Sequence, residues 1–489
     1  MTLPDDSLEQ LEADHPPRDA CGVFGVWAPG EDVSKLTYFG LYALQHRGQE
    51  SAGMAVSNGE RIMVYKDMGL VSQVFDEPAL NSLQGHLSVG HCRYSTTGAS
   101  TWDNAQPTFV ATAAAGGLAL AHNGNLTNTD ELETWLAEQG SGQPVPRKDR
   151  MDSTSDTAIL TALLSAFSGE GIERAALQVL PRLVGAFCLV FCTENSLYAA
   201  RDPQGIHPLV LGRLDHGWVV ASETAALDIV GASFIREVEP GEFVVIESSG
   251  VRSSRFAPAA PRGCLFEYVY LARPDTTISG RRVHSVRKEI GRTLAMEAPA
   301  DADLVIPTPE SGTPSAIGYA EASGIPYGQG LVKNAYVGRT FIQPSQTIRQ
   351  LGIRLKLNPI RDVIEGKRLV VVDDSIVRGN TQRALVRMLR EAGALEVHVR
   401  IASPPVEWPC YFGIDFATRA ELIAPGLTEE QICRSLGADS LGYISLAGLV
   451  ASTGLAKRTL CRACFDGEYP VPIPLQRARQ MELEGKYGC

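Results

Sequence analysis

The apolar pattern of this chain changes character near its middle, and this change limits the folds that the chain can form. From Cys21 to about Ile246, short apolar runs such as GLALAHN and GAFCLVFCT lie between glycine-rich turns, which is typical of antiparallel sheets. Later strands such as KRLVVVDD alternate with helical segments such as TQRALVRMLREAG, which is typical of βαβ units around a parallel sheet. Since 489 residues exceed the reach of one hydrophobic core, two large domains are expected.

The domain boundaries follow from composition. The segments SKLTYFGLYALQ, NTDELETWLAEQ and SDTAILTALLSAF show helical spacing, so the first domain is expected to mix helices with its sheets. Ser248–Gly263 is rich in Ser, Pro, Ala and Arg, has little periodicity, and is interpreted as the connection between the domains. The expected division is a leader of residues 1–20, a first domain of 21–263 and a second domain of 264–489.

The charge of the chain excludes some partners. A formal net charge of -12 disfavours a general nucleic-acid or membrane-surface binder, so an anionic ligand needs a local basic patch.

No apolar run reaches the roughly 18 residues of a membrane span. The first twenty residues carry six acids against Arg18 alone and do not form a secretory signal, so a cytoplasmic location is expected. Ten cysteines in such a chain indicate thiols, metal ligands or a nucleophile rather than disulfides.

The segment LVVVDDSIVRGNT, Leu369 to Thr381, predicts a phosphate site in the second domain. An apolar strand runs into two acids, a short loop and then a helix, whose first amides and positive dipole end suit a phosphate. An acidic pair alone is more often a solvated turn, but the full ordered segment favours a site. It resembles the signature of the type I phosphoribosyltransferases, which bind 5-phosphoribosyl 1-diphosphate (PRPP). The resemblance implies that the acids face the ribose hydroxyls and a metal, and that the loop wraps the 5-phosphate.

A basic stretch before this segment supplies the patch that an anionic substrate requires. Residues 333–368 hold eight Lys or Arg against Asp362 and Glu365 only. Its KNAYVGRTFIQPSQ part is interpreted as a mobile cover that closes over a diphosphate, with an ordinary solvated loop as the alternative. The full set of candidate PRPP-binding residues is Lys333, Arg339, Asp373, Asp374, Ser375, Ile376, Val377, Arg378, Gly379, Asn380 and Thr381.

Cys21 raises a separate question, because it follows a polar leader and begins the run CGVFG. A cysteine freed at a new N-terminus carries an α-amine of pKa about 7.7–8.0, which can take the thiol proton, so that one residue supplies nucleophile and base. Residues 1–20 would then be a propeptide. The alternative is that they are a loose tail and that Cys21 only starts a strand; on these residues alone, the alternative is favoured.

Further motifs change that judgement, because the first domain resembles the N-terminal nucleophile (Ntn) glutamine amidotransferases. The matching motifs are CGVFG, LQHRGQES, GHCRYSTTG, AHNGNLTN and STSDT. The resemblance makes Cys21 the nucleophile and places the oxyanion donors at the Asn123 side chain and the Gly124 amide. It assigns the carboxylate and ammonium of substrate glutamine to Arg93 and Asp156, with Arg47 and Gly48 in support. The implied fold is an αββα sandwich followed by a type I phosphoribosyltransferase α/β domain.

The two halves together resemble the family of glutamine PRPP amidotransferases, from Cys21 to about Tyr469. In the second half, the matching segments are EYVYLARPD, HSVRKEIG, YVGRTFIQPSQ, VVDDSIVRG and GADSLGYIS. The implied reaction converts glutamine, PRPP and water to 5-phosphoribosylamine, glutamate and diphosphate, the first committed step of purine synthesis, with ammonia passed internally between the two sites. One Mg²⁺ per subunit is implied at Ser311, Asp373 and Asp374. Ala335 and Asn380 stand where this family often has Arg and Thr, and Gly312 and Thr313 also depart from the pattern beside Ser311.

The cysteines refine the prediction. Cys461 and Cys464 form a CxxC motif, which suits zinc or an iron–sulfur cluster. In the propeptide-bearing branch of the family, two further cysteines complete a 4Fe-4S site, and Cys264 and Cys410 hold the matching positions here. The resemblance therefore implies one such cluster per subunit. The remaining cysteines, Cys92, Cys188, Cys192 and Cys433, are interpreted as core thiols, and Cys489 as part of the tail.

Two alternative functions compete with this one. One is an amidotransferase that aminates a sugar phosphate or a keto acid, which the segment at Asp373 and Asp374 disfavours. The other is a regulatory protein on a phosphoribosyltransferase fold that binds nucleic acid without catalysis, which the acidic charge and the glutaminase motifs disfavour. The resemblance further implies feedback inhibition by purine nucleotides, a homotetramer or homodimer, and no nucleic-acid or membrane partner.

Overall fold

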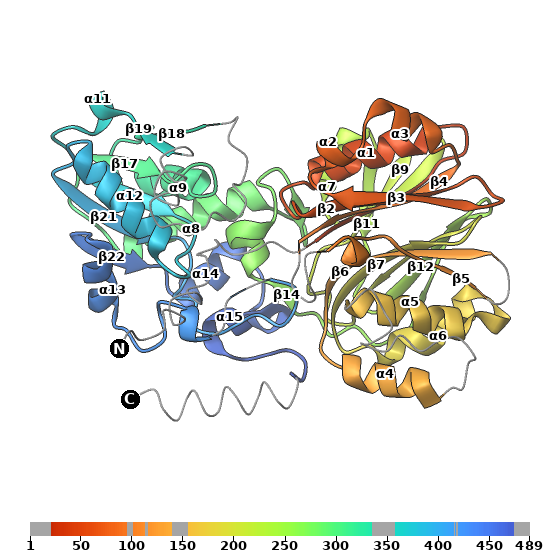
Figure 1. Ribbon diagram of the computed structural model, residues 1–489. Helices are drawn as coiled ribbons and strands as arrows, with labels where there is room; N and C mark the ends of the chain where they lie inside the picture. The colour runs from red at the N-terminus through yellow and green to blue at the C-terminus, as the bar shows by residue number, and fades with distance from the viewer. Residues whose placement is uncertain are drawn as a thin grey trace, which may run out of the picture.

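The computed structural model describes residues 21–94, 101–112, 116–138, 155–334, 357–414, 416 and 419–473. The two halves of the chain form two bodies that lie side by side in Figure 1, the first half on the right and the second on the left. Two antiparallel sheets make up most of the first body, and a parallel sheet lies at the centre of the second. The two-domain architecture expected from the change in apolar pattern is confirmed.

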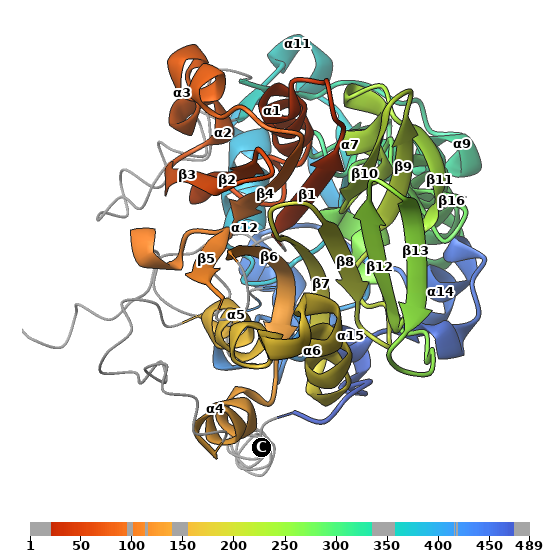
Figure 2. The ribbon, with the colours of Figure 1, turned by 90° about the vertical axis from the view of Figure 1, so that its right-hand side faces the viewer.

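Two sheets stack in the first body (Figure 2). The larger has the order β11-β9-β10-β1-β4-β2-β3, and the smaller has the order β13-β12-β8-β7-β6-β5. The strands of the larger sheet are β1 (Gly22–Trp27), β2 (Ser51–Ser57), β3 (Ile62–Met68), β4 (Leu87–Arg93), β9 (Val210–Leu214), β10 (Gly217–Ala221) and β11 (Ser233–Glu237). Those of the smaller sheet are β5 (Thr108–Ala111), β6 (Gly117–Leu126), β7 (Gly185–Cys192), β8 (Leu197–Arg201), β12 (Glu242–Glu247) and β13 (Gly250–Arg255).

Helices cover the outer face of each sheet. The larger sheet packs against α1 (Val33–Ala43), α2 (Val71–Val74), α3 (Glu77–Ser82) and α7 (Thr224–Ile229), and the smaller against α4 (Thr129–Glu138), α5 (Asp156–Ala166) and α6 (Ile172–Val179). The alternation of side chains along a strand explains the layers: in β1, Phe24 and Val26 face the helices, whereas Val23 faces the other sheet. The result is the αββα sandwich expected of an Ntn hydrolase. Short 3₁₀ turns complete this half at η1 (Trp102–Asn104), η2 (Ser168–Glu170) and η3 (Leu180–Arg182).

The interpretation of Ser248–Gly263 as a connection is wrong for part of that stretch. Residues Gly250–Arg255 form β13, which pairs with β12 along its full length. Because β13 is the edge of its sheet and most of its residues are exposed, its composition is polar and carries no strong alternation. The boundaries of the two domains themselves stay predictions.

A parallel sheet of order β17-β20-β21-β22 lies at the centre of the second body. Its strands are β17 (Leu304–Pro307), β20 (Arg368–Asp373), β21 (Glu396–Ile401) and β22 (Ser440–Tyr443). The surrounding helices are α8 (Val283–Glu297), α9 (Thr313–Ser323), α11 (Arg361–Ile364), α12 (Asn380–Glu391), α13 (Glu429–Leu436), α14 (Leu446–Thr453) and α15 (Ala463–Asp466). Short elements are β14 (Gly263–Cys264) with β23 (Leu460–Cys461), β15 (Thr277–Ile278) with β16 (Arg281–Arg282), β18 (Leu331–Lys333) with β19 (Leu357–Pro359), a π-helical turn η4 (Glu267–Leu271), η5 (Arg419–Glu421) and η6 (Lys457–Thr459).

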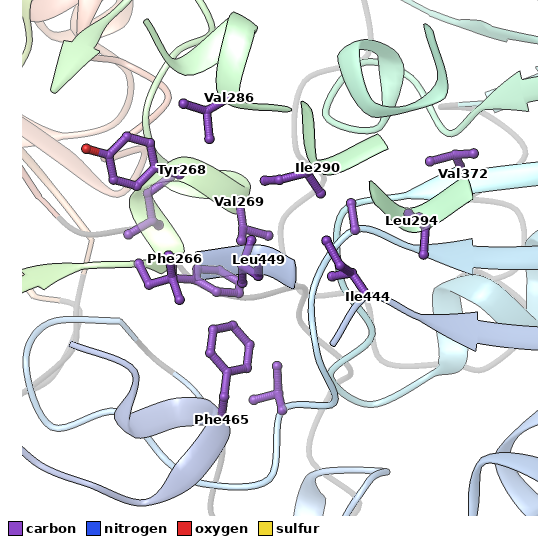
Figure 3. Close-up of a cluster of buried hydrophobic side chains, with 14 of the residues drawn as sticks. Phe266, Tyr268, Val269, Val286, Ile290, Leu294, Val372, Ile444, Leu449 and Phe465 are labelled. Carbon is purple, nitrogen blue, oxygen red and sulfur yellow. The ribbon is translucent and has the colours of Figure 1, made fainter. Parts of the chain in front are cut away.

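The core of the second body joins its first residues to its last. Figure 3 shows Phe266 near Phe465, and Ile290 and Leu294 of α8 extending the same cluster toward Val372 of the sheet. This cluster fixes η4 against residues near the C-terminal end of the described chain. Within the described residues, no helix combines the length and the apolar character needed to cross a membrane.

Candidate active site

Cys21 lies directly before β1 and is 7% exposed. Its Sγ accepts a hydrogen bond from the Tyr94 amide at 3.4 Å and is 3.3 Å from the Tyr94 carbonyl oxygen, to which the thiol donates. Burial raises the pKa of the Cys21 thiol to about 11, although the Tyr94 hydrogen bond and the charge of Arg93 act in the opposite direction. As long as Cys21 is an internal residue, its thiol is therefore protonated at neutral pH and needs a nearby base to react.

The charged residues assigned to glutamine binding lie around this thiol. The charges of Arg93, Glu50 and Asp156 all act on Cys21, so the sandwich brings together residues far apart in sequence. Burial alone would raise the pKa of Asp156, but His122, whose Nδ1 is 3.6 Å from Oδ2, lowers it below its usual value. Asp156 Oδ2 also accepts the Leu126 amide at 3.0 Å. Asp156 therefore presents a negative charge inside the site.

Asn123 and Gly124 occupy β6, the strand that carries the predicted oxyanion donors. The Asn123 side chain is fully buried, and neither its Nδ2 nor its Oδ1 has a hydrogen-bond partner within the described part of the chain. A buried amide without partners costs free energy, so it indicates a place where a ligand supplies them. Gly124 has φ +139, and a Cβ there would lie 2.1 Å from the Ala186 carbonyl oxygen, so only glycine fits.

Arg47 is buried at the meeting point of the two domains. Its Nη1 and Nη2 donate to Glu267 at 3.2 and 2.6 Å, and its Nε donates to Glu223. Glu223 also accepts from Thr276 Oγ1 at 2.6 Å and lies 2.7 Å from His46 Nε2. Arg47 therefore belongs to a buried ionic network that links Glu223 of the first domain to Glu267 of η4 in the second domain.

The second site lies at the carboxyl end of β20. Asp373 Oδ1 accepts the Asp374 amide at 2.9 Å, and Asp374 Oδ1 accepts from Ser375 Oγ at 2.6 Å. Burial raises the pKa of both carboxyl groups, and the charge of Asp374 raises that of Asp373 further. Ser311 also interacts with Asp374, which assembles the oxygen donors that Mg²⁺ prefers.

The loop after these acids leads into α12 as the sequence predicts. Gly379 is the N-cap, with φ +82, and a Cβ there would lie 2.7 Å from the Ile423 side chain. In the first turn, Gln382 donates to Asp373 Oδ2, while its Oε1 is buried without a partner in the described residues. The first amides of α12 thus open beside the acid pair, in the arrangement that suits a phosphate.

The basic stretch falls only partly on described residues. Lys333, at the end of β18, has its Nζ 3.5 Å from Glu310 Oε2, and Arg378 donates to Glu421 at 2.8 Å. The expected cover segment lies outside the described residues from Ala335 onward, which includes Arg339, as do Cys489 and the leader.

The four candidate cluster cysteines converge from distant parts of the second domain. Cys264 and Cys461 are directly paired in the parallel bridge of β14 and β23. Burial raises the pKa of Cys264, Cys461 and Cys464, and the charge of each thiolate acts on neighbours within this set, including Cys410. No group of three or more His, Cys, Asp or Glu in the described residues has the spacing of a formed metal site. The electrostatic coupling within the set nevertheless shows that the four thiols lie in one neighbourhood of the second domain.

Sequence reasoning missed the partners of Arg47. Glu223, Glu267 and His207 are all buried and together connect the glutaminase half to the second domain. Glu267 begins the EYVYLARPD motif, which carries part of the resemblance. The sequence therefore marked this segment but did not indicate that Glu267 pairs with Arg47. Nothing in the surroundings of Glu223 or His207 in the sequence marks either residue.

The fold and the site define a glutamine amidotransferase whose Ntn domain is joined to a phosphoribosyltransferase domain. A family model described as a glutamine amidotransferase domain matches residues 91–228. The amidophosphoribosyltransferase of Mycobacterium tuberculosis (strain ATCC 25618 / H37Rv) is 64% identical over 96% of this chain and 90% of its own length. That of Bacillus subtilis (strain 168) is 46% identical over 93% and 95%. The chain belongs to the amidophosphoribosyltransferase family, which catalyses the first committed step of purine biosynthesis.

Solved structures agree with this assignment. The chain is similar to the B. subtilis glutamine PRPP amidotransferase complexed with ADP and GMP, with a TM-score of 0.86, 45% identity, and coverage of 93% of this chain and 98% of that one. It is equally similar to a structure described as the allosteric regulatory enzyme of purine biosynthesis, with a TM-score of 0.86 and 45% identity.

Proposed function

We propose that this enzyme releases ammonia from glutamine at Cys21 and passes it internally to PRPP bound at Asp373 and Asp374. The observation that carries the first step is the fully buried Asn123 side chain, whose two polar atoms are both without partners among the described residues, in a site that also holds Cys21 and Asp156. The proposed products are 5-phosphoribosylamine, glutamate and diphosphate.

Catalysis begins once residues 1–20 are removed, which makes Cys21 the first residue. Its α-amine takes the thiol proton, the thiolate sulfur attacks the glutamine amide carbon, and the carbonyl electron pair moves onto oxygen. The Asn123 side chain and the Gly124 amide donate to this oxyanion. When the carbonyl re-forms, the nitrogen leaves with the proton as ammonia, and water then hydrolyses the thioester to glutamate and free thiol. Burial of Cys21 explains the need for a base on the same residue, because the thiol alone is too weakly acidic.

Substrate glutamine is held by its α-groups. Arg93 pairs with the carboxylate and the ionised Asp156 with the ammonium, which positions the side-chain amide over Cys21. Both residues are almost fully buried, so these charge pairs act in a medium of low dielectric constant and are strong. Arg47 supports the pocket through its hydrogen bonds to Glu223 and Glu267.

At the second site, ammonia attacks C1 of the ribose, the bond to diphosphate breaks, and the added nitrogen loses a proton. Asp373 and Asp374 hold the ribose hydroxyls, and the loop of residues 375–381 with the first amides of α12 holds the 5-phosphate. Lys333 and Arg339 contribute positive charge. A magnesium ion held by Ser311, Asp373 and Asp374 would neutralise the leaving diphosphate.

A 4Fe-4S cluster at Cys264, Cys410, Cys461 and Cys464 is proposed on the basis of the neighbouring thiols and their all-sulfur chemistry. The cluster would tie the C-terminal residues to the start of the second domain. We also propose a cytoplasmic location, a homodimer or homotetramer, and inhibition by purine nucleotides, since the similar B. subtilis enzyme is described in complex with ADP and GMP.

The test is glutamine hydrolysis by anaerobically purified protein, with and without PRPP and Mg²⁺, beside its intact mass and iron content. Hydrolysis that rises with PRPP, on protein beginning at Cys21, is the expected result. Protein that begins at Cys21 and contains iron, yet hydrolyses no glutamine, would refute the role of Cys21. A rate of glutamine hydrolysis that does not change when PRPP is added, with no phosphoribosylamine formed, would refute the role of the second site.

A further inference from the structure

His207 connects the two domains immediately beside the oxyanion strand. It follows β8, and its ring is completely buried. Nδ1 lies 3.0 Å from Glu267 Oε1, and Nε2 lies 2.7 Å from the Phe412 carbonyl oxygen. Each ring nitrogen therefore faces an oxygen atom, one from a carboxylate and one from a backbone carbonyl. The ring is thus held from two sides and has a single orientation.

The carbonyl that His207 binds belongs to a segment of the second domain that packs on Gly124. In this segment, residues 410–414, the Tyr411 carbonyl oxygen accepts from Asn125 Nδ2 at 2.9 Å. A Cβ on Gly413 would lie 3.2 Å from Gly124 Cα and 3.2 Å from His207 Nε2. The segment is therefore in direct contact with the backbone that supplies an oxyanion donor.

Glu267 anchors the other side of the ring. It takes two hydrogen bonds from Arg47, which in turn binds Glu223, so the position of His207 is fixed by a buried row of alternating charges. Such a row is rigid because each charge would be costly to leave unpaired in the interior. His207 thus links this network to the Phe412 carbonyl, in the segment that contacts Gly124.

We propose that His207 is a positioning residue of the glutaminase reaction: by holding the Phe412 carbonyl, it presses the 410–414 segment onto Gly124 and Asn125 and so sets the direction of the oxyanion donors. This inference rests on the proposed function of Asn123 and Gly124. It assigns to the second domain a direct part in the geometry of the first active site, through contacts with its backbone.

The test compares two variants that release the segment from opposite sides. His207→Phe keeps a ring but removes both ring nitrogens, and Asn125→Ala removes the donor to Tyr411. Loss of one oxyanion donor typically costs 10²–10³-fold in kcat, so a displaced donor is expected to lower the kcat of glutamine hydrolysis by roughly 10–100-fold. The KM for glutamine is expected to stay within about twofold, because the groups that bind the substrate are untouched.

Alkylation of Cys21 by iodoacetamide separates positioning from general damage. This displacement at carbon forms no oxyanion, so its rate in both variants is expected to match the wild type. His398→Phe is the matched control, because His398 also bonds through both nitrogens, to Ser440 and Glu396, but entirely within the second domain. It is expected to leave kcat unchanged.

Two results would overturn the inference: an unchanged kcat in His207→Phe, or an alkylation rate that falls as much as kcat in both variants. In the second case the residue maintains the whole site rather than the oxyanion donors. A wild-type enzyme that fails to hydrolyse glutamine would instead refute the proposed function, so the two failures are distinguishable.

Discussion

Replacing Arg47 by Met tests the ionic network between the domains most directly. The side chain is 0% exposed and makes three hydrogen bonds to two buried carboxylates, Glu223 and Glu267. Met fills similar space but leaves Glu267 without its main counter-charge. Breaking a buried pair by removing one partner costs about 3–5 kcal/mol, mostly because a charge remains unpaired in the interior. At about 2–4 °C per kcal/mol for domains of this size, the expected drop in Tm is on the order of 10 °C.

The sign of the pH dependence follows from the two carboxylates. Burial tends to raise their pKa, but Arg47 lowers the pKa of both below the usual value, so their contribution is present above the unfolded pKa and lost as pH falls through the folded one. In Arg47→Met, burial without the cation raises the folded pKa of Glu267, and protonation on acidification relieves its stranded charge. The difference in Tm between wild type and variant is therefore expected to be larger at about pH 7.5 than at about pH 5.

The assay is thermal unfolding followed by calorimetry at both pH values, with Arg252→Met as the control. Arg252 also makes two hydrogen bonds to one carboxylate, Glu173, but the pair is exposed, so its loss should cost less than about 1 kcal/mol. An Arg47→Met protein as stable as the Arg252→Met protein, or one whose deficit grows toward acid pH, would contradict the argument.

Three further outcomes are expected. Asn123→Ala should lower the kcat of glutamine hydrolysis by about 10²–10³-fold with little change in KM, and steady-state kinetics showing a mainly KM effect would contradict its oxyanion role. Asp373→Asn should abolish PRPP-dependent formation of phosphoribosylamine while glutamine hydrolysis without PRPP persists, and loss of both activities would argue against separate sites. Cys264→Ser should lower the iron content and the visible absorbance of anaerobically purified protein, whereas Cys433→Ser, which changes a cysteine outside the proposed set, should not.

Local pattern predicted the fold because each half repeats one simple rule. Short apolar runs such as the one ending in Trp27 bury one face against helices and the other against a second sheet, which leads to the sandwich. The four apolar residues before Asp373, Leu369–Val372, are typical of a strand that is buried on both faces of a parallel sheet. The strand β13 was missed because an exposed edge needs no apolar alternation.

The site was predictable only in part. Motifs located Cys21, Asn123 and Asp374 because the chemistry requires those residue types within short, ordered strings. The contacts of Arg47 were not predictable, because its partners lie 176 and 220 residues away and no local pattern pairs a buried guanidinium with a given carboxylate. His207 escaped for the same reason, since its two acceptors belong to elements formed by distant parts of the chain.

The contact between Asn125 and Tyr411 also sets an order of events during synthesis. The two residues are 286 positions apart. The partner of Cys264 in its bridge, Cys461, comes later in the chain than Tyr411. A ribosome therefore completes the whole sandwich, including the strand of Gly124, long before the segment that rests on it has been made. If His207 positions that segment as proposed, a nascent chain holds every glutamine-binding group yet lacks the support for its oxyanion donors. On that proposal, hydrolysis of glutamine at full rate waits until the half that uses the ammonia has been made.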